Sequence, residues 1–220
     1  MLNSAPKISV ILLAGGTGSR MKSSTPKQFL LLKGKPIILY SYEVFAALPE
    51  ISEIIVVCDP QYQSIFPQCK FALPGKERQD SVFHGLELVS PEADFVMVHD
   101  GARPFITSEL VKHLIKEAEI HTTVASAVPV KATIKEATPE GLVIKTLNRK
   151  ALWEMHTPQV TTPKLLRDGL HLSRSQNIPL TDDVAAVEIL GHPVKLVHGS
   201  YQNIKITTPE DLIIAQAFLA

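Results

Sequence analysis

The chain has 220 residues, of which 45% are hydrophobic and 20% charged, enough for one α/β domain with a substantial core. Its formal net charge is +0, so it lacks the basic surplus typical of nucleic-acid-binding proteins. No apolar run approaches the roughly 20 residues that a membrane helix needs, and the first residues, MLNSAPK, do not resemble a signal peptide. The only cysteines, Cys58 and Cys69, have no CxxC or metal-type spacing. We therefore expect a cytoplasmic protein with free thiols and with neither a nucleic-acid nor a membrane partner.

The first predicted element is a buried strand that leads into a glycine loop. The run 8–13, ISVILL, is apolar and partly β-branched, as in a strand buried on both faces. It is followed by Gly15-Gly16-Thr17-Gly18, where the backbone can lie close to a ligand, and then by Arg20 and Lys27. A glycine loop with two cations favours a polyphosphate site; the alternative is a tight turn without a ligand.

Two common phosphate loops do not fit this stretch. The dinucleotide fingerprint G-x-G-x-x-G matches Gly16 and Gly18, but Met21 stands where the third glycine belongs. The P-loop needs Gly-Lys-Ser/Thr five residues after its first glycine, and neither Gly15 nor Gly16 meets that spacing. A dinucleotide-dependent oxidoreductase is therefore disfavoured, also because no obvious ribose-binding acid follows the second predicted strand.

Further along the chain, predicted helices and strands alternate. We expect a helix over 37–48 with Pro36 in its first turn, a strand over 53–58, a short helix and strand within 65–73, a helix over 80–89, a strand over 94–99, a helix over 108–120 and a strand over 123–130. Helices are expected over 161–172 and 181–190, strands over 193–197 and 203–206, and a last helix to 219 with Thr208 as its N-cap. This alternation predicts a doubly wound, mostly parallel sheet of the Rossmann-like kind in a single domain spanning 1–220.

The segment 131–149 breaks the alternation. Two short alternating runs, 133–135 and 143–145, flank Pro139-Glu140-Gly141, which is a turn signal. The predicted β-hairpin is polar on both faces, and an isolated two-stranded hairpin is marginal in water. We therefore expect an arm over about 131–152 that packs on something outside its own domain.

Polar residues follow several of the predicted strands. Arg20 and Lys27 follow the first, Asp100 and Arg103 follow the strand over 94–99, and Lys205 lies at the end of a late strand. Ligands of open α/β sheets bind beyond the carboxyl ends of the strands, so these cations predict a substrate with several phosphates. No nucleophile elbow, kinase loop or CxxC motif occurs. Phosphoryl or nucleotidyl transfer fits best, because its catalysis is mostly positioning and charge neutralisation.

Six motifs carry a specific resemblance. In chain order they are LAGGTGSRMKSSTPKQFL (13–30), ERQDSV (77–82), VHDGARP (98–104), LW-x-x-x-TPQ (152–159), TDD (181–183) and NIKITTPEDL (203–212). Together they resemble the motif series of the 2-C-methyl-D-erythritol 4-phosphate cytidylyltransferases over nearly the whole chain. The resemblance implies transfer of CMP from CTP to the methylerythritol phosphate, with release of pyrophosphate, in the non-mevalonate route to isoprenoids. It also implies Mg²⁺ on the triphosphate.

The resemblance assigns roles residue by residue. Arg20 and Lys27 would stabilise the transition state at the triphosphate, and Lys205 and Arg149 would position the acceptor phosphate. The residues implied at the nucleotide are Ala14, Gly15, Gly16, Gly18, Gly75, Ser81 and Asp100; those implied at the acceptor are Arg103, Thr133, Thr157 and Thr181. In the family the arm crosses to a second subunit, so a homodimer with exchanged arms is implied, in which Thr133 and Arg149 act in trans.

The match also has departures. Gly15 and Gly101 replace alanines, and both should be tolerated because both residue types are small. Ala132 stands where an aspartate is usual, and His156 where a glutamine is usual. Because these two lie in or near the arm, a cytidylyltransferase for another polyol phosphate, such as ribitol 5-phosphate, remains the alternative.

Overall fold

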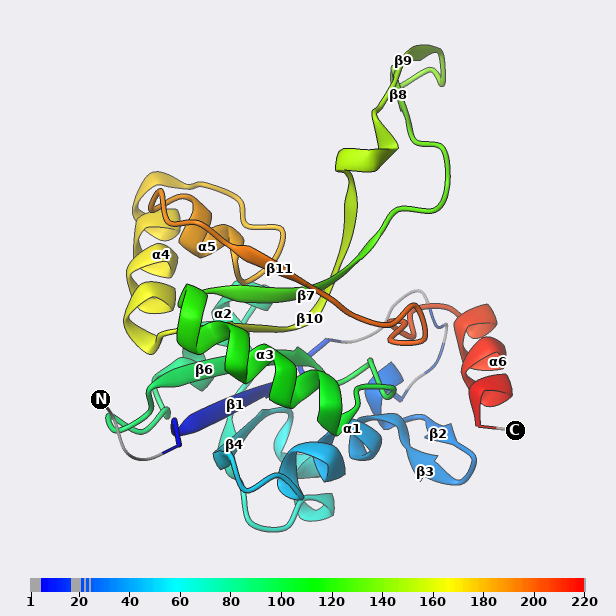
Figure 1. Cartoon of the computed structure of the whole chain (residues 1–220). Helices are drawn as coiled ribbons and strands as arrows, with labels where there is room; N and C mark the ends of the chain where they lie inside the picture. Colours follow the sequence, from blue (N-terminus) through cyan, green and yellow to red (C-terminus); the bar gives the residue numbers. More distant parts are fainter. Residues whose placement is uncertain (1–4, 17–20, 22, 24, 220) are drawn as a thin grey trace.

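The computed structural model describes residues 5–16, 21, 23 and 25–219. A seven-stranded sheet forms its centre, in the order β11-β7-β10-β6-β1-β4-β5 (Figure 1). In chain order the strands are β1 (Ile8–Leu13), β4 (Ile51–Val57), β5 (Lys70–Ala72), β6 (Phe95–Asp100), β7 (Val124–Pro129), β10 (Trp153–Thr161) and β11 (Lys195–His198). All neighbours pair in parallel except β10, which is antiparallel to both β6 and β7. The predicted mostly parallel sheet is confirmed.

Helices cover both faces of this sheet. The helices α1 (Ile37–Ala46) and α3 (Ser108–His121) contribute to one apolar cluster, whereas α2 (Arg78–Leu86), α4 (Pro163–Gln176) and the short α5 (Ala185–Glu188) line the other face. Every residue of β1 is buried, and its side chains alternate between the two clusters. This explains why β1 reads as a continuous apolar run, and it confirms the doubly wound architecture.

Smaller elements complete the chain. The strands β2 (Leu31–Leu32) and β3 (Lys35–Pro36) form a short sheet, and α6 (Pro209–Phe218) packs beside it through Ala215. Short 3₁₀ helices in the described part of the chain include η2 (Lys27–Phe29), η3 (Pro60–Ile65) and η4 (Arg149–Ala151). Thr208 caps α6 as predicted, because its side chain accepts a hydrogen bond from Asp211 N.

One strand was not predicted, and three local predictions need correction. Strand β10 was not predicted, because its sequence, WEMHTPQVT, mixes polar residues with a proline and lacks a clear strand period. Residues 203–206 form no strand; they are held by single bonds such as Ile206 N to Ala102 O at 2.9 Å. The helix predicted over 181–190 is only α5, whose N-cap is Val184; the residues before it form turns in which Asp182 accepts from Ala185 N. Pro36 lies at the N-cap of α1 rather than in its first turn.

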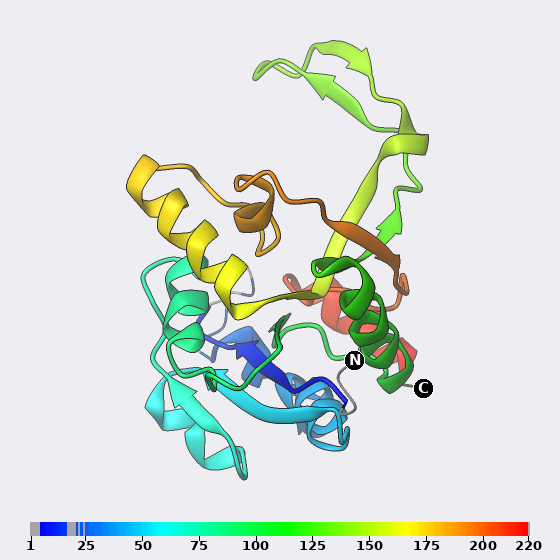
Figure 2. The same cartoon turned by 60° about the vertical axis from the view of Figure 1, so that its left-hand side comes forward.

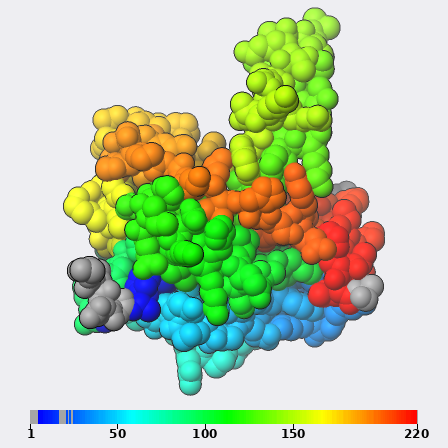
Figure 3. Space-filling view, viewed as in Figure 1, coloured from blue at the N-terminus to red at the C-terminus, as the bar shows by residue number. Residues whose placement is uncertain are grey.

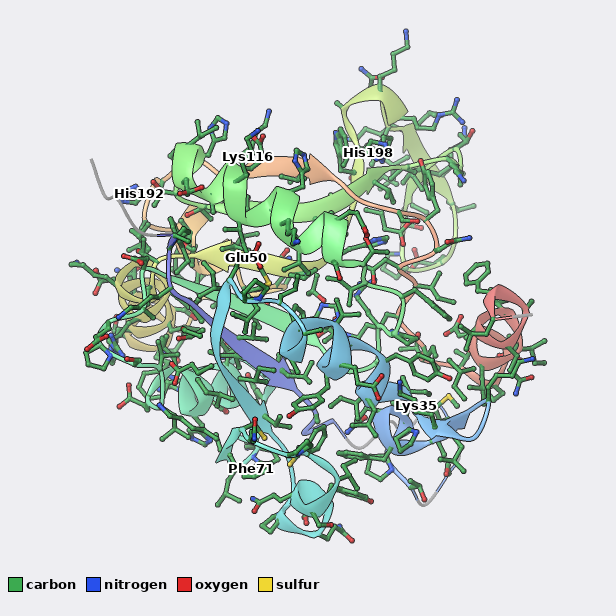
Figure 4. All side chains as sticks on the ribbon, turned by 60° about the horizontal axis from the view of Figure 1, so that its bottom comes forward. Lys35, Glu50, Phe71, Lys116, His192 and His198 are labelled. Carbon is green, nitrogen blue, oxygen red and sulfur yellow. The ribbon has the colours of Figure 1, made fainter. Side chains whose placement is uncertain are left out.

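The predicted hairpin projects from the body as an arm (Figures 1 and 2). Its strands β8 (Lys135–Ala137) and β9 (Val143–Thr146) pair antiparallel, with Glu136 opposite Lys145. No residue between 131 and 151 is buried, and the space-filling view shows the arm standing clear of the body (Figure 3). At its base, Trp153 lies edge-on to His198, which Figure 4 labels beside the arm.

Among the helices that the structure describes, none is both long enough and apolar enough to cross a membrane.

Candidate functional site

Two adjoining pockets lie at the carboxyl ends of β1 and β6. The first, of about 430 Å³, is lined by the loop after β1, the segment that leads into α2 and the turn after β6. Predicted residues gather there as expected: Gly15, Gly16, Lys27, Gly75, Ser81, Asp100 and Lys205. Ala14 is buried and does not line the pocket, whereas Gly18 and Arg20 lie outside the described residues.

Two glycines let the backbones around this pocket approach each other closely. A Cβ added at Gly15 would lie 2.5 Å from Pro74 Cβ, and one at Gly75 would lie 2.1 Å from Asp80 Cβ. Both positions therefore leave no room for a side chain in this structure. An alanine at position 15 would require Pro74 to shift, so the packing around the loop is matched to the glycine that this chain carries.

A buried glutamine holds the glycine loop. Gln28 Nε2 donates to Ala14 O at 2.5 Å and to Gly16 O at 3.1 Å, so η2 is tied to the loop after β1. Lys27, the neighbouring residue, lines the pocket at the start of η2. Sequence reasoning missed Gln28, although its place directly after Pro26-Lys27 in a quoted motif marked the position.

The second pocket, of about 300 Å³, lies between β10, the segment 181–182 and the Asp100 turn. Its lining includes Arg103, Thr157, Thr181 and Lys205, which are four of the residues predicted for the acceptor. Arg78, Asp100 and Lys205 line both pockets. The two pockets therefore meet at a single cluster of charged side chains.

Asp100 is the centre of that cluster. Lys205 Nζ lies 2.9 Å from its carboxylate, Arg78 lies 3.3 Å away and Arg103 lies 3.4 Å away. Burial raises the pKa of Asp100, but the charges of Arg78, Lys205 and Arg103 outweigh burial and hold it well below its usual range. Asp100 is therefore a buried carboxylate that stays ionised.

A chain of hydrogen bonds fixes the turn between Asp100 and Arg103. Asp100 N donates to Thr157 Oγ1 at 3.0 Å, Thr157 Oγ1 is 3.0 Å from His99 Nδ1, and His99 Nε2 is 3.0 Å from Arg103 O. A carbonyl oxygen only accepts, so Nε2 carries the proton and Nδ1 accepts from the Thr157 hydroxyl. Burial lowers the pKa of His99 to about 4, which keeps this ring neutral. The Thr157 hydroxyl is thus engaged inside the protein even though the residue lines the second pocket.

Backbone carbonyls hold Arg103 in place. Its guanidinium donates to Asn203 O at 2.8 Å and to Met155 O at 3.4 Å, and the side chain is only 10% exposed. Asn203 Nδ2 in turn donates to Thr157 O at 2.8 Å. Residues after β6, in β10 and before α6 are therefore joined directly beneath the two pockets.

Gln159 organises the segment 181–184 on the far side of the second pocket. Its Oε1 accepts from the backbone of Asp183 and of Val184, both at 2.9 Å, and its Nε2 donates to Asp182 at 3.0 Å. Thr181, the residue predicted for the acceptor, is exposed at the pocket's edge. Gln159 was visible in the TPQ motif, but nothing in the sequence indicated what it would hold.

Arg78 is the most consequential residue that sequence reasoning missed. Its Nη1 and Nη2 donate to the two carboxylate oxygens of Asp183 at 2.7 and 2.8 Å, and its Nη2 and Nε also reach Asp100. The ERQDSV motif contains this arginine, but a charged residue at the start of a helix reads as solvent-exposed when its partners are distant in sequence.

The arm residues lie away from both pockets of their own chain. Thr133 and Arg149 are exposed and line neither pocket. Arg149 Nη1 donates to Lys131 O at 2.6 Å, a bond within the arm. One chain therefore does not bring its own Arg149 to its own Lys205.

A doubly wound sheet with a glycine loop and two pockets that share a cationic cluster at the strand ends defines a nucleotidyltransferase. The family model described as 2-C-methyl-D-erythritol 4-phosphate cytidylyltransferase matches residues 8–220. This chain belongs to that family. No observation favours the dinucleotide-dependent oxidoreductase.

Relatives and solved structures agree with this membership. The chain is 51% identical to the chloroplastic 2-C-methyl-D-erythritol 4-phosphate cytidylyltransferase of Oryza sativa, over 96% of this chain and 74% of the relative. It is 46% identical to the Chlamydia pneumoniae enzyme of the same name, over 97% and 99%. The crystal structure of 4-diphosphocytidyl-2C-methyl-D-erythritol synthase from Anaerococcus prevotii superposes with a TM-score of 0.86 at 30% identity, covering 98% of this chain and 99% of that one. The crystal structure of the cytidylyltransferase from Thermus thermophilus gives 0.82 at 30% identity, covering 96% and 98%.

Proposed function

We propose that this chain transfers CMP from CTP to 2-C-methyl-D-erythritol 4-phosphate and releases pyrophosphate. One observation carries the proposal beyond family membership: two adjoining pockets share Arg78, Asp100 and Lys205. A reaction between two anionic substrates needs two binding sites that meet where cations are fixed. The nucleotide occupies the first pocket and the acceptor the second.

The first pocket binds the nucleotide through small residues and cations. Gly15, Gly16, Gly75 and Ser81 contact the base and the start of the triphosphate, and Gly75 is itself held because its N donates to Ser81 Oγ at 2.9 Å. Ala14 and Gly18 belong to the same loop. Lys27 and Arg20 stabilise the charge that develops on the α-phosphate and on the leaving pyrophosphate.

The second pocket holds the acceptor with its phosphate toward Lys205. Arg103, Thr157 and Thr181 line the side where the polyol lies. Thr133 and Arg149 complete the site from the arm of a second copy, because they line neither pocket of their own chain. The exposed apolar side chains of the arm, Leu142 at 69% and Ile144 at 58%, favour burial against such a partner.

The reaction follows from this arrangement. A phosphate oxygen of the acceptor attacks the α-phosphorus of CTP, and the bond from that phosphorus to the oxygen bridging to the β-phosphate breaks. Both electrons of this bond leave with pyrophosphate, so the step needs no protein nucleophile and no proton transfer. The chain's own cations bring the two anions together in line and neutralise the charge on the leaving group.

The donor set fits magnesium that is carried mainly by phosphates. Among the described residues no group of three or more His, Cys, Asp or Glu side chains could hold a metal ion. Mg²⁺ commonly keeps several waters and binds one or two carboxylates together with substrate phosphates. The exposed Glu77 lines the first pocket and could provide one such carboxylate, whereas the Asp100 carboxylate is already paired with Arg78, Arg103 and Lys205. When bound, Mg²⁺ supplies further charge neutralisation at the triphosphate.

Two further proposals concern the extent of the catalytic domain and the compartment in which the chain works. Residues 1–220 form one catalytic domain with the arm inserted over about 131–152. The chain works in a reducing compartment, which we take to be the cytoplasm, because Cys58 and Cys69 are free thiols. The name of the rice relative places that protein in the chloroplast, so fluorescence of a tagged full-length chain in its own cells is the test.

The decisive experiment compares acceptors. Purified protein is incubated with CTP, Mg²⁺ and either 2-C-methyl-D-erythritol 4-phosphate or ribitol 5-phosphate, and the release of pyrophosphate is followed. We expect the methylerythritol phosphate to have the higher kcat/KM. Faster turnover with ribitol 5-phosphate would replace the acceptor in this proposal and keep the mechanism. Release with neither acceptor would refute both.

A further inference from the structure

The shared charge cluster contains two kinds of cation. Arg103 and Arg78 are fixed, the first by backbone carbonyls and the second by both carboxylate oxygens of Asp183. Lys205 differs in its partners rather than in exposure, which is 35% against 33% for Arg78. Among the described residues its ammonium pairs with Asp100 alone, and it lies on an irregular segment rather than in a strand. Of the described cations around Asp100, Lys205 therefore has the fewest constraints.

The pairing of Lys205 with Asp100 conflicts with the role proposed for Lys205. In the structure its Nζ lies 2.9 Å from the Asp100 carboxylate, whereas the proposed function requires this ammonium at the acceptor phosphate. If Lys205 turns to that phosphate, Asp100 is left buried with only its remaining partners. A buried carboxylate that loses a partner is costly unless other cations stay in contact with it.

Arg78 can remain in contact with Asp100 and so avoid the free-energy cost of leaving this buried carboxylate without enough partners. It contacts Asp100 at 3.3 and 3.4 Å while Asp183, whose side chain is 5% exposed, holds the guanidinium from the other side. Arg78 also lies where the two pockets meet. Its contacts with Asp100 do not depend on where Lys205 points.

We propose that Arg78, backed by Asp183, is the positioning residue that keeps Asp100 neutralised when Lys205 turns from this carboxylate to the acceptor phosphate. Until the acceptor binds, the Asp100 carboxylate is the anion that pairs with Lys205 Nζ; the acceptor phosphate then takes over this pairing. This inference rests on the proposed function, and it deepens it by assigning a role to a residue in neither of the predicted substrate sets.

The test uses three variants, because Arg78→Met alone leaves Asp183 buried without its partner and is expected to unfold more easily. Arg78→Met/Asp183→Leu removes the pair together and restores an apolar contact. Asp183→Asn is the matched control, since it retains Arg78, one acceptor oxygen behind the guanidinium and the contacts of Arg78 to Asp100. Calorimetry measures the Kd of the methylerythritol phosphate and the Kd of CTP separately, and thermal unfolding is recorded for each variant.

The expected result is a split between the two ligands. In the double variant, Lys205 stays on Asp100, so the Kd of the acceptor should rise about tenfold, as loss of one charged contact predicts. The Kd of CTP should stay within about threefold of the wild type. Asp183→Asn should show no such split. Equal weakening of both ligands, or an acceptor Kd close to the wild-type value in a folded double variant, would overturn the role of Arg78.

Turnover is measured separately on the same proteins. Should the wild type bind both ligands but release no pyrophosphate, the proposed reaction fails while the binding split still decides the role of Arg78.

Discussion

The body and the arm of this protein are stabilised in opposite ways. In β1 every side chain is buried between two helical layers, whereas no residue from 131 to 151 is buried. The arm strands are linked by cross-strand pairs such as Lys145 Nζ and Glu136 at 2.9 Å, which contribute little in water. The described lining of the nucleotide pocket therefore comes from the body, whereas the acceptor site, under the proposed exchange of arms, would also need this exposed element.

The largest expected effect tests the body. Lys27→Ala should lower kcat by about 10²-fold or more, because it removes a cation from the developing charge at the α-phosphate. Steady-state kinetics with both substrates measure it. Lys116→Ala is the control, since this exposed lysine, labelled on α3 in Figure 4, belongs to a helix that lines neither pocket. A near-normal rate for Lys27→Ala in a folded protein would remove this lysine from the transition state.

The next prediction tests the arm. Arg149→Ala should also inactivate homodimers, but mixing it with Lys27→Ala chains should restore activity if arms are exchanged. One site of each mixed dimer then has an intact body and an intact partner arm, so about a quarter of all sites should recover after random reassortment. Native mass spectrometry verifies the mixed dimers. If the verified mixed dimers remain inactive, Arg149 does not act in trans.

A smaller effect is expected at the glycine loop. Gly15→Ala brings a methyl group to 2.5 Å from Pro74 Cβ, so the loop must shift, and the KM for CTP should rise about tenfold with little change for the acceptor. Gly16→Ala, where nothing lies within 4 Å, is the sterically matched comparison and should raise this KM less. Equal effects of the two variants would mean that the close approach of the loop to Pro74 is unimportant.

The smallest effect concerns stability and pH. His99 has a pKa lowered by burial to about 4, whereas an unfolded histidine titrates near 6.5. Below about pH 6.5, His99 therefore binds a proton in the unfolded chain but not in the folded chain. The free energy of unfolding falls as the pH falls toward 4.

Chemical denaturation at several pH values measures this dependence. His99→Gln should reduce the slope of unfolding free energy against pH between 6.5 and 4 by at most about 1.4 kcal/mol per pH unit. His113→Gln, which replaces an exposed histidine of α3, is the control. An unchanged slope in His99→Gln would show that this ring is not what titrates on unfolding.

Elements with a local sequence signal could be predicted, whereas elements placed by distant neighbours could not. Elements buried on both faces, such as β1 and β4, carry a local apolar signal, and the hairpin carries a turn signal at Pro139-Glu140-Gly141. Strand β10 carries neither, because its place between β6 and β7 is decided by neighbours distant in the chain. For the same reason the cations after β1 and β6 were recognisable at strand ends, while the partners of Arg78 lie 22 and 105 residues away.

The route of β10 has a mechanical consequence. This strand begins at Trp153, at the base of the arm, and runs to Thr161 in the centre of the sheet. On the way it presents Met155 O to Arg103 and the Thr157 hydroxyl to the Asp100 backbone. About 13 Å of strand separates Trp153 from Thr157. A displacement of the arm would therefore be transmitted along β10 to Thr157 and, through its hydrogen bond, to the turn that holds Asp100. In the proposed dimer, contact between the arm and a second copy would constrain the geometry of that turn.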